Sequence, residues 1–546
     1  MEDPKDKIYS ILEKVISEKF AIDDVSSMIQ VTIPKDPQFG DFMSNIAMYA
    51  FGTVRGNVPG SRSHHLAVRA GNPLEFSQLI VDEISAQNLD MFDKVEAVAP
   101  GFINFYLSQK YLQSQVQNII EAGDTYGSLN IGQGKKASVE YVSANPTGPL
   151  HLGNARGGFY GDSIGRVCRK GGFEVTNEYY VNDAGEQVLK LGHSVLKDDE
   201  AVYVGEYIDG LNKKFGDSVD IKEVGEKSAR VIIDEIVKKT VAEKMQINFD
   251  VWMSEKSLYD EGFVDKAIGI LEKNKLTYEN DGALWLKTTD FRDDKDRVLV
   301  KTDGQKTYFA SDCGYILNKM ERGFQKMIEI WGADHHGYIN RFRAASEALG
   351  FKGELKFLVV QLVRLVKDGK ETRMSKRAGN VVYIDELIDK VGHDVARFFF
   401  VMYSPDTHMN FDLGLAEERS EKNPVFYVQY AHARICSILR KAEEQKIIFA
   451  GADLSRLNQE KELSLIKELN KFPEMVEEVA ESYEVHKLPY YVIRLADKLH
   501  AYYNECRIID ESDLVLTKAR LSLITAVRIV LRETLQLIGV DAPEKM

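Results

Sequence analysis

Three residues at the start of a predicted helix have the types and spacing to bind phosphate. His151, Gly153 and Asn154 follow a β-prone run at 137–142 and a loop rich in proline and glycine at 144–149. A strand, such a loop and a helix start bring backbone N–H groups and the positive end of the helix dipole together, and this arrangement binds anions. His151 and Asn154 lie one turn apart, so both side chains can face one phosphate. The pattern predicts a nucleotide-binding turn, although an ordinary capped helix start would contain the same residues.

A basic loop farther along the chain supports the nucleotide-binding interpretation. The run from Arg373 to Arg377 reads Arg-Met-Ser-Lys-Arg and follows an apolar, strand-like segment at 355–366. It resembles the Lys-Met-Ser-Lys-Ser loop of class I aminoacyl-tRNA synthetases, and His151 with Asn154 resembles the His-x-Gly-His signature of the same enzymes. Two such motifs in this order, each after a strand, favour a class I enzyme over a chance match.

The elements that must hold these residues are typical of an α/β fold. Short apolar runs at 137–142, 173–181 and 327–331 alternate with helical periods, which indicates a doubly wound parallel sheet of the Rossmann-like kind. Ligands of such sheets bind beyond the carboxyl ends of the strands, where the polar clusters of this sequence fall. We therefore expect a catalytic domain at 130–385, with a helical insertion at about 190–280.

Length and periodicity predict further domains on both sides of the catalytic one. At 546 residues the chain is too long for a single core. Residues 1–120 have the pattern of a separate N-terminal α/β domain, because a helical stripe precedes strand-like runs. Residues 386–410 connect the catalytic domain to a C-terminal all-α helix bundle at 411–546, where apolar stripes recur at helical spacing.

Composition is that of an ordinary globular protein, with 44% hydrophobic and 28% charged residues. No apolar run has the length of a membrane span and the N-terminus lacks the pattern of a signal peptide, so we expect a cytoplasmic protein without a membrane partner. The net charge of −14 argues against nucleic-acid binding by the whole surface, but a local basic face could still bind a phosphate backbone. The four cysteines form no Cys-x-x-Cys pair and are expected in the core.

Two histidine clusters could suggest a metal, but neither has the spacing of a ligand set. His64 and His65 are adjacent and have no further ligands nearby in the sequence. Asp334, His335 and His336 lack a His-x-x-x-His spacing and accompanying cysteines. We expect solvated side chains in the first case and a substrate contact or structural role in the second, and no protein-bound metal.

The resemblance to class I enzymes extends over nearly the whole chain and becomes more specific at its ends. The passages 38–47 and 101–107 resemble the N-terminal domain of arginyl-tRNA synthetases, which contacts the corner of the tRNA in that family. The passages 430–434 and 501–507, with the ending 539–544, resemble their anticodon-binding domain. Only about 54–72 and parts of 190–280 match nothing. The sequence is therefore similar to the arginyl-tRNA synthetases of bacterial type.

This resemblance implies a reaction and a set of site residues. Arginine and ATP, which brings Mg²⁺ with it, would form arginyl-adenylate and pyrophosphate, and arginine would then pass to tRNA(Arg); activation in this family needs bound tRNA. We expect a monomer. The residues implied for catalysis are His151, Asn154 and Lys376. The residues implied for ATP binding are these three together with Gly153, Met374 and Ser375. The residues implied for arginine binding are Glu140, Ser143, Asn145, Tyr308, Asp312 and His336.

A guanidinium group favours planar acceptors, ideally paired carboxylates, and Glu140 and Asp312 could supply them. Asp312 could instead only cap a helix that begins near Cys313. Asn154 in place of the usual histidine, and Arg373 and Arg377 in the basic loop, depart from the family motifs.

Several alternatives to an arginine enzyme stay open at this point. A nucleotidylyltransferase for small molecules would share the phosphate turn without needing the terminal domains. A non-catalytic tRNA-binding paralogue would keep those domains and lose motif residues, whereas His151, Lys376, Glu140 and Asp312 are present. Within class I, a lysyl or cysteinyl enzyme is the nearest alternative, and the carboxylate pair with the absence of cysteine clusters disfavours the cysteinyl type.

Overall fold

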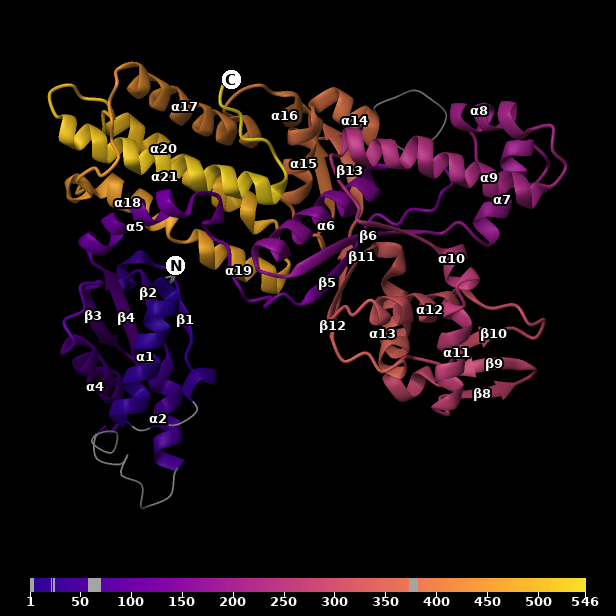
Figure 1. Cartoon of the computed structure of the whole chain (residues 1–546), viewed down its shortest axis with the longest axis horizontal. Helices are drawn as coiled ribbons and strands as arrows, with labels where there is room; N and C mark the ends of the chain where they lie inside the picture. The colour runs from indigo at the N-terminus through magenta and orange to yellow at the C-terminus, as the bar shows by residue number, and fades with distance from the viewer. Residues whose placement is uncertain (1–3, 21, 23–24, 57–69, 373–381) are drawn as a thin grey trace.

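The structure is a computed structural model that describes residues 4–20, 22, 25–56, 70–372 and 382–546. The molecule is elongated, with the N-terminal region below the C-terminal helices at one end and the central sheet in the middle (Figure 1). His64 and His65 lie outside the described residues, as do Met374, Ser375 and Lys376 of the basic loop with the two arginines beside them.

A five-stranded parallel sheet forms the centre of the catalytic region. Its strands are β5 (Lys136–Glu140), β6 (Glu174–Val181), β7 (Val251–Ser254), β11 (Lys326–Gly332) and β12 (Glu354–Val360). Their order across the sheet is β12-β11-β5-β6-β7, and every neighbouring pair is parallel. The strands proceed outward from β5 in both directions, so the order reverses between β5 and β11. The predicted doubly wound parallel sheet is confirmed, and its ligand crevice is expected at that reversal.

Helix α6 (Leu152–Lys170) connects β5 to β6 and starts where the phosphate turn was predicted. Phe159, Ile164, Val167 and Cys168 recur at helical spacing and are all buried. The helix ends at Gly171. Further helices of the catalytic region are α10 (Glu255–Asp260), α11 (Phe263–Lys273), α12 (Tyr308–Glu321) and α13 (Ile339–Ala348).

The region expected as a helical insertion is mostly helical, but one strand of the central sheet interrupts it. Its helices are α7 (Glu186–Leu196), α8 (Glu206–Phe215) and α9 (Ile221–Val231), and π-helical turns continue to Lys244. The chain then returns to the central sheet as β7, whose four residues are too few to show a period in the sequence. Helices α10 and α11 follow β7, and a small antiparallel sheet comes after them, formed by β8 (Thr277–Asn280), β9 (Ala283–Leu286) and β10 (Arg297–Val300).

The N-terminal region is an antiparallel sheet covered by helices. In α1 (Pro4–Phe20) the apolar stripe is buried, as its spacing predicted. The remaining elements are β1 (Val31–Thr32), β2 (Phe42–Ser44), α2 (Ile46–Gly56), α4 (Pro73–Ser85), β3 (Phe92–Val98) and β4 (Phe102–Leu107). The sheet order is β1-β2-β4-β3. Helix α5 (Gln109–Ala122) leads from this region into the catalytic one.

The C-terminal region is a bundle of long helices. The apolar run 355–366 divides between β12 and β13 (Val363–Lys367), which belong to different sheets. The connecting elements are β14 (Lys370–Glu371), α14 (Ile384–Val391), α15 (His393–Val401), β15 (Met409–Asp412) and α16 (Leu413–Glu417). The bundle helices are α17 (Pro424–Glu444), α18 (Glu460–Leu469), α19 (Phe472–Ser482), α20 (Lys487–Glu505) and α21 (Leu514–Ile538). All four cysteines are buried and unpaired.

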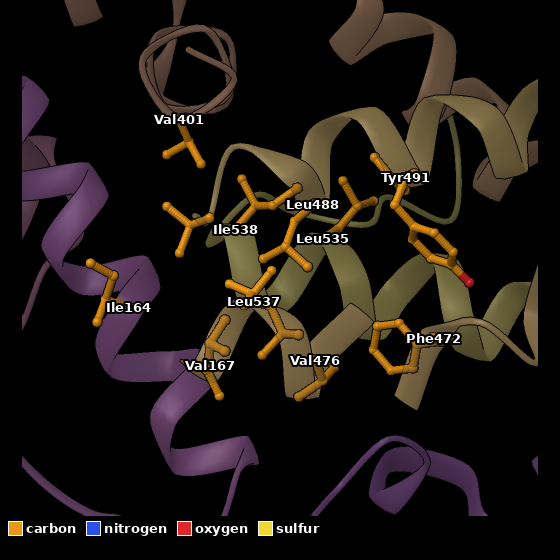
Figure 2. Packing of buried hydrophobic residues seen from close by; sticks show 14 of the residues in the cluster. Ile164, Val167, Val401, Phe472, Val476, Leu488, Tyr491, Leu535, Leu537 and Ile538 are labelled. Carbon is orange, nitrogen blue, oxygen red and sulfur yellow. The ribbon is translucent and has the colours of Figure 1, made fainter. Parts of the chain in front are cut away.

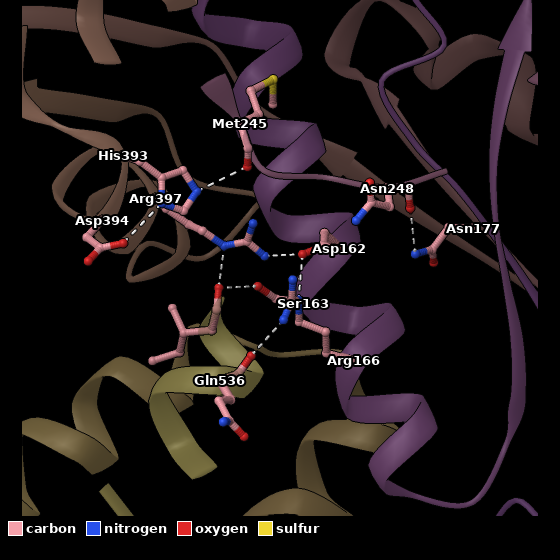
Figure 3. Close-up of polar contacts among 11 residues, drawn as sticks. Asp162, Ser163, Arg166, Asn177, Met245, Asn248, His393, Asp394, Arg397 and Gln536 are labelled. Atoms are coloured by element: carbon pink, nitrogen blue, oxygen red, sulfur yellow. Dashed lines mark hydrogen bonds and ion pairs between the residues drawn. The ribbon is translucent and has the colours of Figure 1, made fainter. Parts of the chain in front are cut away.

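Helix α6 also anchors the bundle. Ile164 and Val167 face the end of α21 across an apolar contact (Figure 2). Beside it, buried Arg397 of α15 forms an ion pair with Asp162 of α6 and donates a hydrogen bond of 2.5 Å from Nε to the carbonyl oxygen of Ile538 (Figure 3). The helix that begins at the phosphate turn is therefore fixed at its middle to the C-terminal bundle.

Candidate active site

A cavity of about 840 Å³ lies at the carboxyl ends of the central strands. It is lined by most of the predicted site residues: Glu140, Ser143, Asn145, His151, Gly153, Asn154, Tyr308 and Asp312. His336 is not among the lining residues and is exposed in the turn after β11, whereas its neighbours Asp334 and His335 do line the cavity. The structure thus brings residues from β5, α6 and α12 to one place, and of the run Asp334-His335-His336 it places the first two at the cavity.

His151 and Asn154 cap helix α6 reciprocally. Nδ1 of His151 accepts hydrogen bonds from the backbone N–H groups of Gly153 (3.1 Å) and Asn154 (3.4 Å), and Oδ1 of Asn154 accepts one from the backbone N–H of His151 (3.1 Å). Desolvation lowers the pKa of His151, and the charge of Asp334 opposes this shift. A neutral imidazole whose Nδ1 accepts must carry its proton on Nε2. Nε2–H of His151 and the amide N–H groups of Asn154 therefore remain as donors.

The backbone N–H groups at the start of α6 are already bonded, contrary to the expectation that they bind the anion. Those of Gly153 and Asn154 reach His151, and that of Leu152 donates to the carbonyl oxygen of Val382 over 3.3 Å. The helix dipole still favours negative charge here. Phosphate recognition by this turn must therefore depend on side-chain donors and the dipole.

The corner between β5 and the phosphate turn holds an unusual backbone. Val142 and Ser143 have φ angles of 68° and 37°, in the left-handed region that a β-branched residue rarely adopts. Both residues line the cavity. Such strain persists where surrounding contacts over-determine it, and it is concentrated at functional sites.

The chain that leaves the basic loop runs next to His151. Ile384 donates its backbone N–H to the carbonyl oxygen of Leu150 over 3.0 Å, and Tyr383 forms an isolated antiparallel bridge with His151. Tyr383 also lines the cavity. The described residues directly after the loop that contains Lys376 are therefore fixed at the phosphate turn.

Glu140 is already neutralised by a buried lysine. Lys319 of α12 is inaccessible to solvent, and its Nζ lies 2.8 Å from Oε2 of Glu140 and 2.7 Å from Oε1 of Glu329. The other oxygen of Glu140 accepts a hydrogen bond from Ser143 over 3.0 Å. The expected guanidinium clamp of Glu140 with Asp312 is therefore not what the structure presents, because Glu140 has a cation of its own.

Asp312 is instead accompanied by Glu255, a residue that no sequence motif singles out. Both line the cavity, and neither forms an ion pair with a described residue. Burial, then the charges of Glu255 and Glu140, raise the pKa of Asp312 to about 7, and burial raises that of Glu255 to about 7. Two carboxylates held in this way favour a cation between them. In sequence, Glu255 looks like an ordinary first-turn acid after Ser254, so only the pairing of β7 with β6 reveals it.

Helix α12 begins before Asp312, so Asp312 cannot be the residue that caps it. Its first residue is Tyr308, and Thr307 is the N-cap, accepting from the backbone N–H of Ala310. The alternative that Asp312 caps a helix beginning near Cys313 is wrong. Tyr308 and Asp312 share one face of the helix, four residues apart.

The remaining predicted residues form the cavity wall. The hydroxyl of Tyr308 accepts a hydrogen bond of 3.1 Å from the backbone N–H of Glu186 in α7. The side-chain amides of Asn145 and Asn182 lie 3.2 Å apart. Among the described residues no group of three or more His, Cys, Asp and Glu side chains is arranged to hold a metal ion. None of the helices in the described part of the chain is long and apolar enough to cross a membrane.

Comparison with known proteins shows which proteins this chain is similar to along its length. The arginine–tRNA ligase of Bacillus licheniformis is 43% identical over 98% of each chain, and that of Listeria monocytogenes is 42% identical over the full length of both. The arginyl-tRNA synthetase of Thermus thermophilus has the same fold, with a TM-score of 0.75 over the whole of both chains at 21% identity.

Three family models match successive parts of the chain. They are the arginyl tRNA synthetase N terminal domain at residues 6–107, the catalytic domain of tRNA synthetases class I (R) at 115–398, and the DALR anticodon binding domain at 428–546. The fold and the site define a class I aminoacyl-tRNA synthetase. With relatives of this identity along its whole length, the chain belongs to the arginyl-tRNA synthetase family.

Proposed function

We propose that the 840 Å³ cavity is the place where this arginine–tRNA ligase activates its amino acid. The enzyme uses ATP to convert L-arginine to arginyl-adenylate and then transfers arginine to tRNA(Arg). Neither the lysyl type nor a non-catalytic paralogue is favoured by the comparisons. The observation that carries our assignment is Asp312, a carboxylate without an ion pair to any described residue, on the wall of the cavity that His151 and Asn154 also line.

ATP would lie against the phosphate turn. The arginine carboxylate attacks the α-phosphate in line with departing pyrophosphate, so catalysis consists mainly of alignment and stabilisation of charge. Nε2–H of His151 and the amide of Asn154 would donate to the α-phosphate, with Gly153 allowing close approach. Lys376 would neutralise the pyrophosphate, and Met374 and Ser375 beside it in the basic loop would contact ATP.

Arginine would extend its guanidinium toward Asp312 and Glu255. Tyr308 would form one wall of that pocket, and Asn145 with Ser143 would contact the amino-acid end near the phosphate turn. Glu140 would contribute through the wall that it builds with Ser143 rather than as a free carboxylate. We retain His336 only as a residue near the rim, since its neighbour His335 faces the cavity.

Transfer RNA would bind the terminal regions. Tyr430 of α17 is half exposed, and its ring is stacked with that of His500, 6.1 Å between centroids. The guanidinium of Arg434 lies 3.5 Å from the centre of the Tyr503 ring. Exposed aromatic rings with arginine are a platform on which unpaired bases stack. We infer that this cluster contacts the anticodon loop and that the N-terminal region contacts another part of the tRNA.

The remaining expectations belong to the same proposal. Mg²⁺ would arrive with ATP, coordinated mainly by phosphates and water. The enzyme would act as a monomer in the cytoplasm, without a membrane partner. Its domains would be 1–120, 130–385, 386–410 and 411–546, with the insertion extending to about 245 before β7 rejoins the sheet.

Asp312→Asn tests the assignment. The substitution keeps the size of the side chain but replaces an anion by an amide, which leaves guanidinium hydrogens unpaired. Breaking a charged pair in a partly dry pocket costs about 2–5 kcal/mol, or roughly 30- to 4000-fold in kcat/KM for arginine. The KM for ATP should stay the same. Asp290→Asn, at an exposed position, is the matched control. A folded Asp312→Asn enzyme with unchanged arginine kinetics would contradict the assignment.

A further inference from the structure

Lys319 occupies an unusual position for a lysine. It lies in the last turn of α12, fully buried, and its ammonium is held by Glu140 of β5 and Glu329 of β11 at 2.8 and 2.7 Å. Glu140 and Glu329 are direct partners in the register of these two strands. The ring centre of Tyr315 lies 4.2 Å from the ammonium. Lys319 therefore bridges the two strands at which the order of the sheet reverses.

The same helix carries residues from the cavity mouth to the buried base of the sheet. Tyr308, Asp312, Tyr315 and Lys319 succeed one another at spacings of three and four residues, so they share one face of α12. Tyr308 is 45% exposed and Lys319 is 0% exposed. Tyr315 donates its hydroxyl to Glu178 over 2.8 Å. The helix face that lines the cavity thus continues directly into the buried charge cluster.

The cluster divides the acidic residues of the site into two kinds. Glu140 and Glu329 share Lys319, and Glu178 pairs with Arg322. Asp312 and Glu255, in contrast, have no ion pair with a residue that the structure describes. A carboxylate whose oxygens are already bonded to an ammonium and a hydroxyl is a poor competitor for a second cation.

We propose that Lys319 is a positioning residue for the arginine site, which acts through Glu140. By holding Oε2 of Glu140, it directs Oε1 to Ser143 and keeps the strained corner at Val142 in place. The guanidinium is thereby directed to Asp312 and Glu255. This inference rests on the proposed function, because it assumes that arginine occupies the cavity.

Steady-state kinetics of Lys319→Met test the proposal. We expect the arginine KM to rise at least about tenfold and the ATP KM to change less than about threefold, because the contacts of the nucleotide lie on α6. Lys352→Met, the same substitution at an exposed lysine outside the cluster, is the matched control, and we expect both of its KM values to stay within about threefold of the wild-type values. An unchanged arginine KM in folded Lys319→Met would overturn the proposal.

A double-mutant cycle separates positioning from general damage. If Lys319 acts through Glu140, Lys319→Met combined with Glu140→Gln should have the arginine KM of Glu140→Gln alone, within about threefold. The double variant also removes both members of the buried pair, so it avoids the unpaired charge that could prevent Lys319→Met from folding. A further loss in the double variant beyond that factor would show that Lys319 does not act through Glu140.

Different results would contradict the assignment of the cavity as the arginine site and the positioning role of Lys319. Wild-type arginine kinetics in Asp312→Asn would contradict the proposal that arginine binds in the cavity. If Asp312→Asn impairs arginine kinetics while the effects of Lys319→Met and Glu140→Gln on the arginine KM are additive, only the positioning role of Lys319 would be contradicted.

Discussion

The hydroxyl of Tyr308, in the first turn of α12, accepts a hydrogen bond of 3.1 Å from the backbone N–H of Glu186, in the first turn of α7. Gly185 is the N-cap of α7 and makes no side-chain bond to it. A Cβ at Gly185 would lie 2.6 Å from this hydroxyl, and its φ of +82° also favours glycine. A residue of the cavity wall therefore caps the first helix of the insertion.

Tyr308→Phe should raise the arginine KM several-fold and leave the ATP KM unchanged. The change removes one neutral hydrogen bond, worth about 1 kcal/mol, or roughly fivefold. Tyr278→Phe, in the small sheet formed by β8, β9 and β10, is the matched control. Steady-state kinetics in both substrates measure the effect. An arginine KM equal to that of the control would mean that this cap does not affect the site.

Arginine affinity should increase between pH 6 and pH 8. The pKa values of Asp312 and Glu255 are raised to about 7, so both carboxylates gain charge over this interval. Arg341 opposes the shift at Asp312, and Glu140 reinforces it. Each protonated carboxylate lowers affinity by about tenfold per pH unit below its pKa. Calorimetric titration with arginine, without ATP, measures the affinity at each pH. The affinity of Asp312→Asn should change less with pH than that of the wild type.

The folding stability of the ligand-free protein should change with pH in the opposite direction to the arginine affinity. A carboxyl whose pKa is higher in the folded state than in the unfolded one contributes stability at low pH, and this contribution is lost as the pH rises through the folded value. The ligand-free protein should therefore lose stability from these two groups between about pH 4 and pH 7. Added arginine should raise the melting temperature more at pH 8 than at pH 6. Equal shifts at both values would contradict the raised pKa values.

Lys376→Ala should lower kcat by about 10²–10³-fold, with little change in the arginine KM. Removing a charge that stabilises a departing group typically has this effect. The described residues after the basic loop are fixed beside His151, which supports a role at the phosphates. Lys370→Ala, an exposed lysine of β14, is the control. A variant that changed only KM would argue for ground-state binding instead.

Asp162→Ala should destabilise the whole protein. It leaves the buried guanidinium of Arg397 without its carboxylate, and breaking a buried pair costs about 3–5 kcal/mol. Arg166, whose Nε lies 2.7 Å from Asp162, would also lose its partner. Urea denaturation measures the loss. Lys190→Ala, which breaks an exposed pair with Glu186, should cause no measurable change, and equal stability of the two variants would contradict the anchoring role of Arg397.

Local patterns in the sequence determined the features that depend on near neighbours. The start of α6 at His151 and its buried face with Ile164 and Val167 follow from a cap and a helical period. The parallel sheet followed from apolar runs that alternate with helices. The strand β7 was not predicted, because four residues are too few to show a period in the sequence.

The tertiary structure alone decided which charges meet. Glu140 lies far from Lys319 and Glu329 in sequence, and they form a buried cluster because β5 and β11 become neighbours where the sheet order reverses. Glu255 reaches the cavity with Asp312 because β7 pairs with β6. Side-chain types and the family resemblance suggested Glu140 and Asp312 as the carboxylates for a guanidinium, whereas in the structure Glu140 is paired with Lys319 and Glu255 accompanies Asp312. Electrostatic partners depend on distance in space and on burial, and neither is encoded in the spacing of residues along the chain.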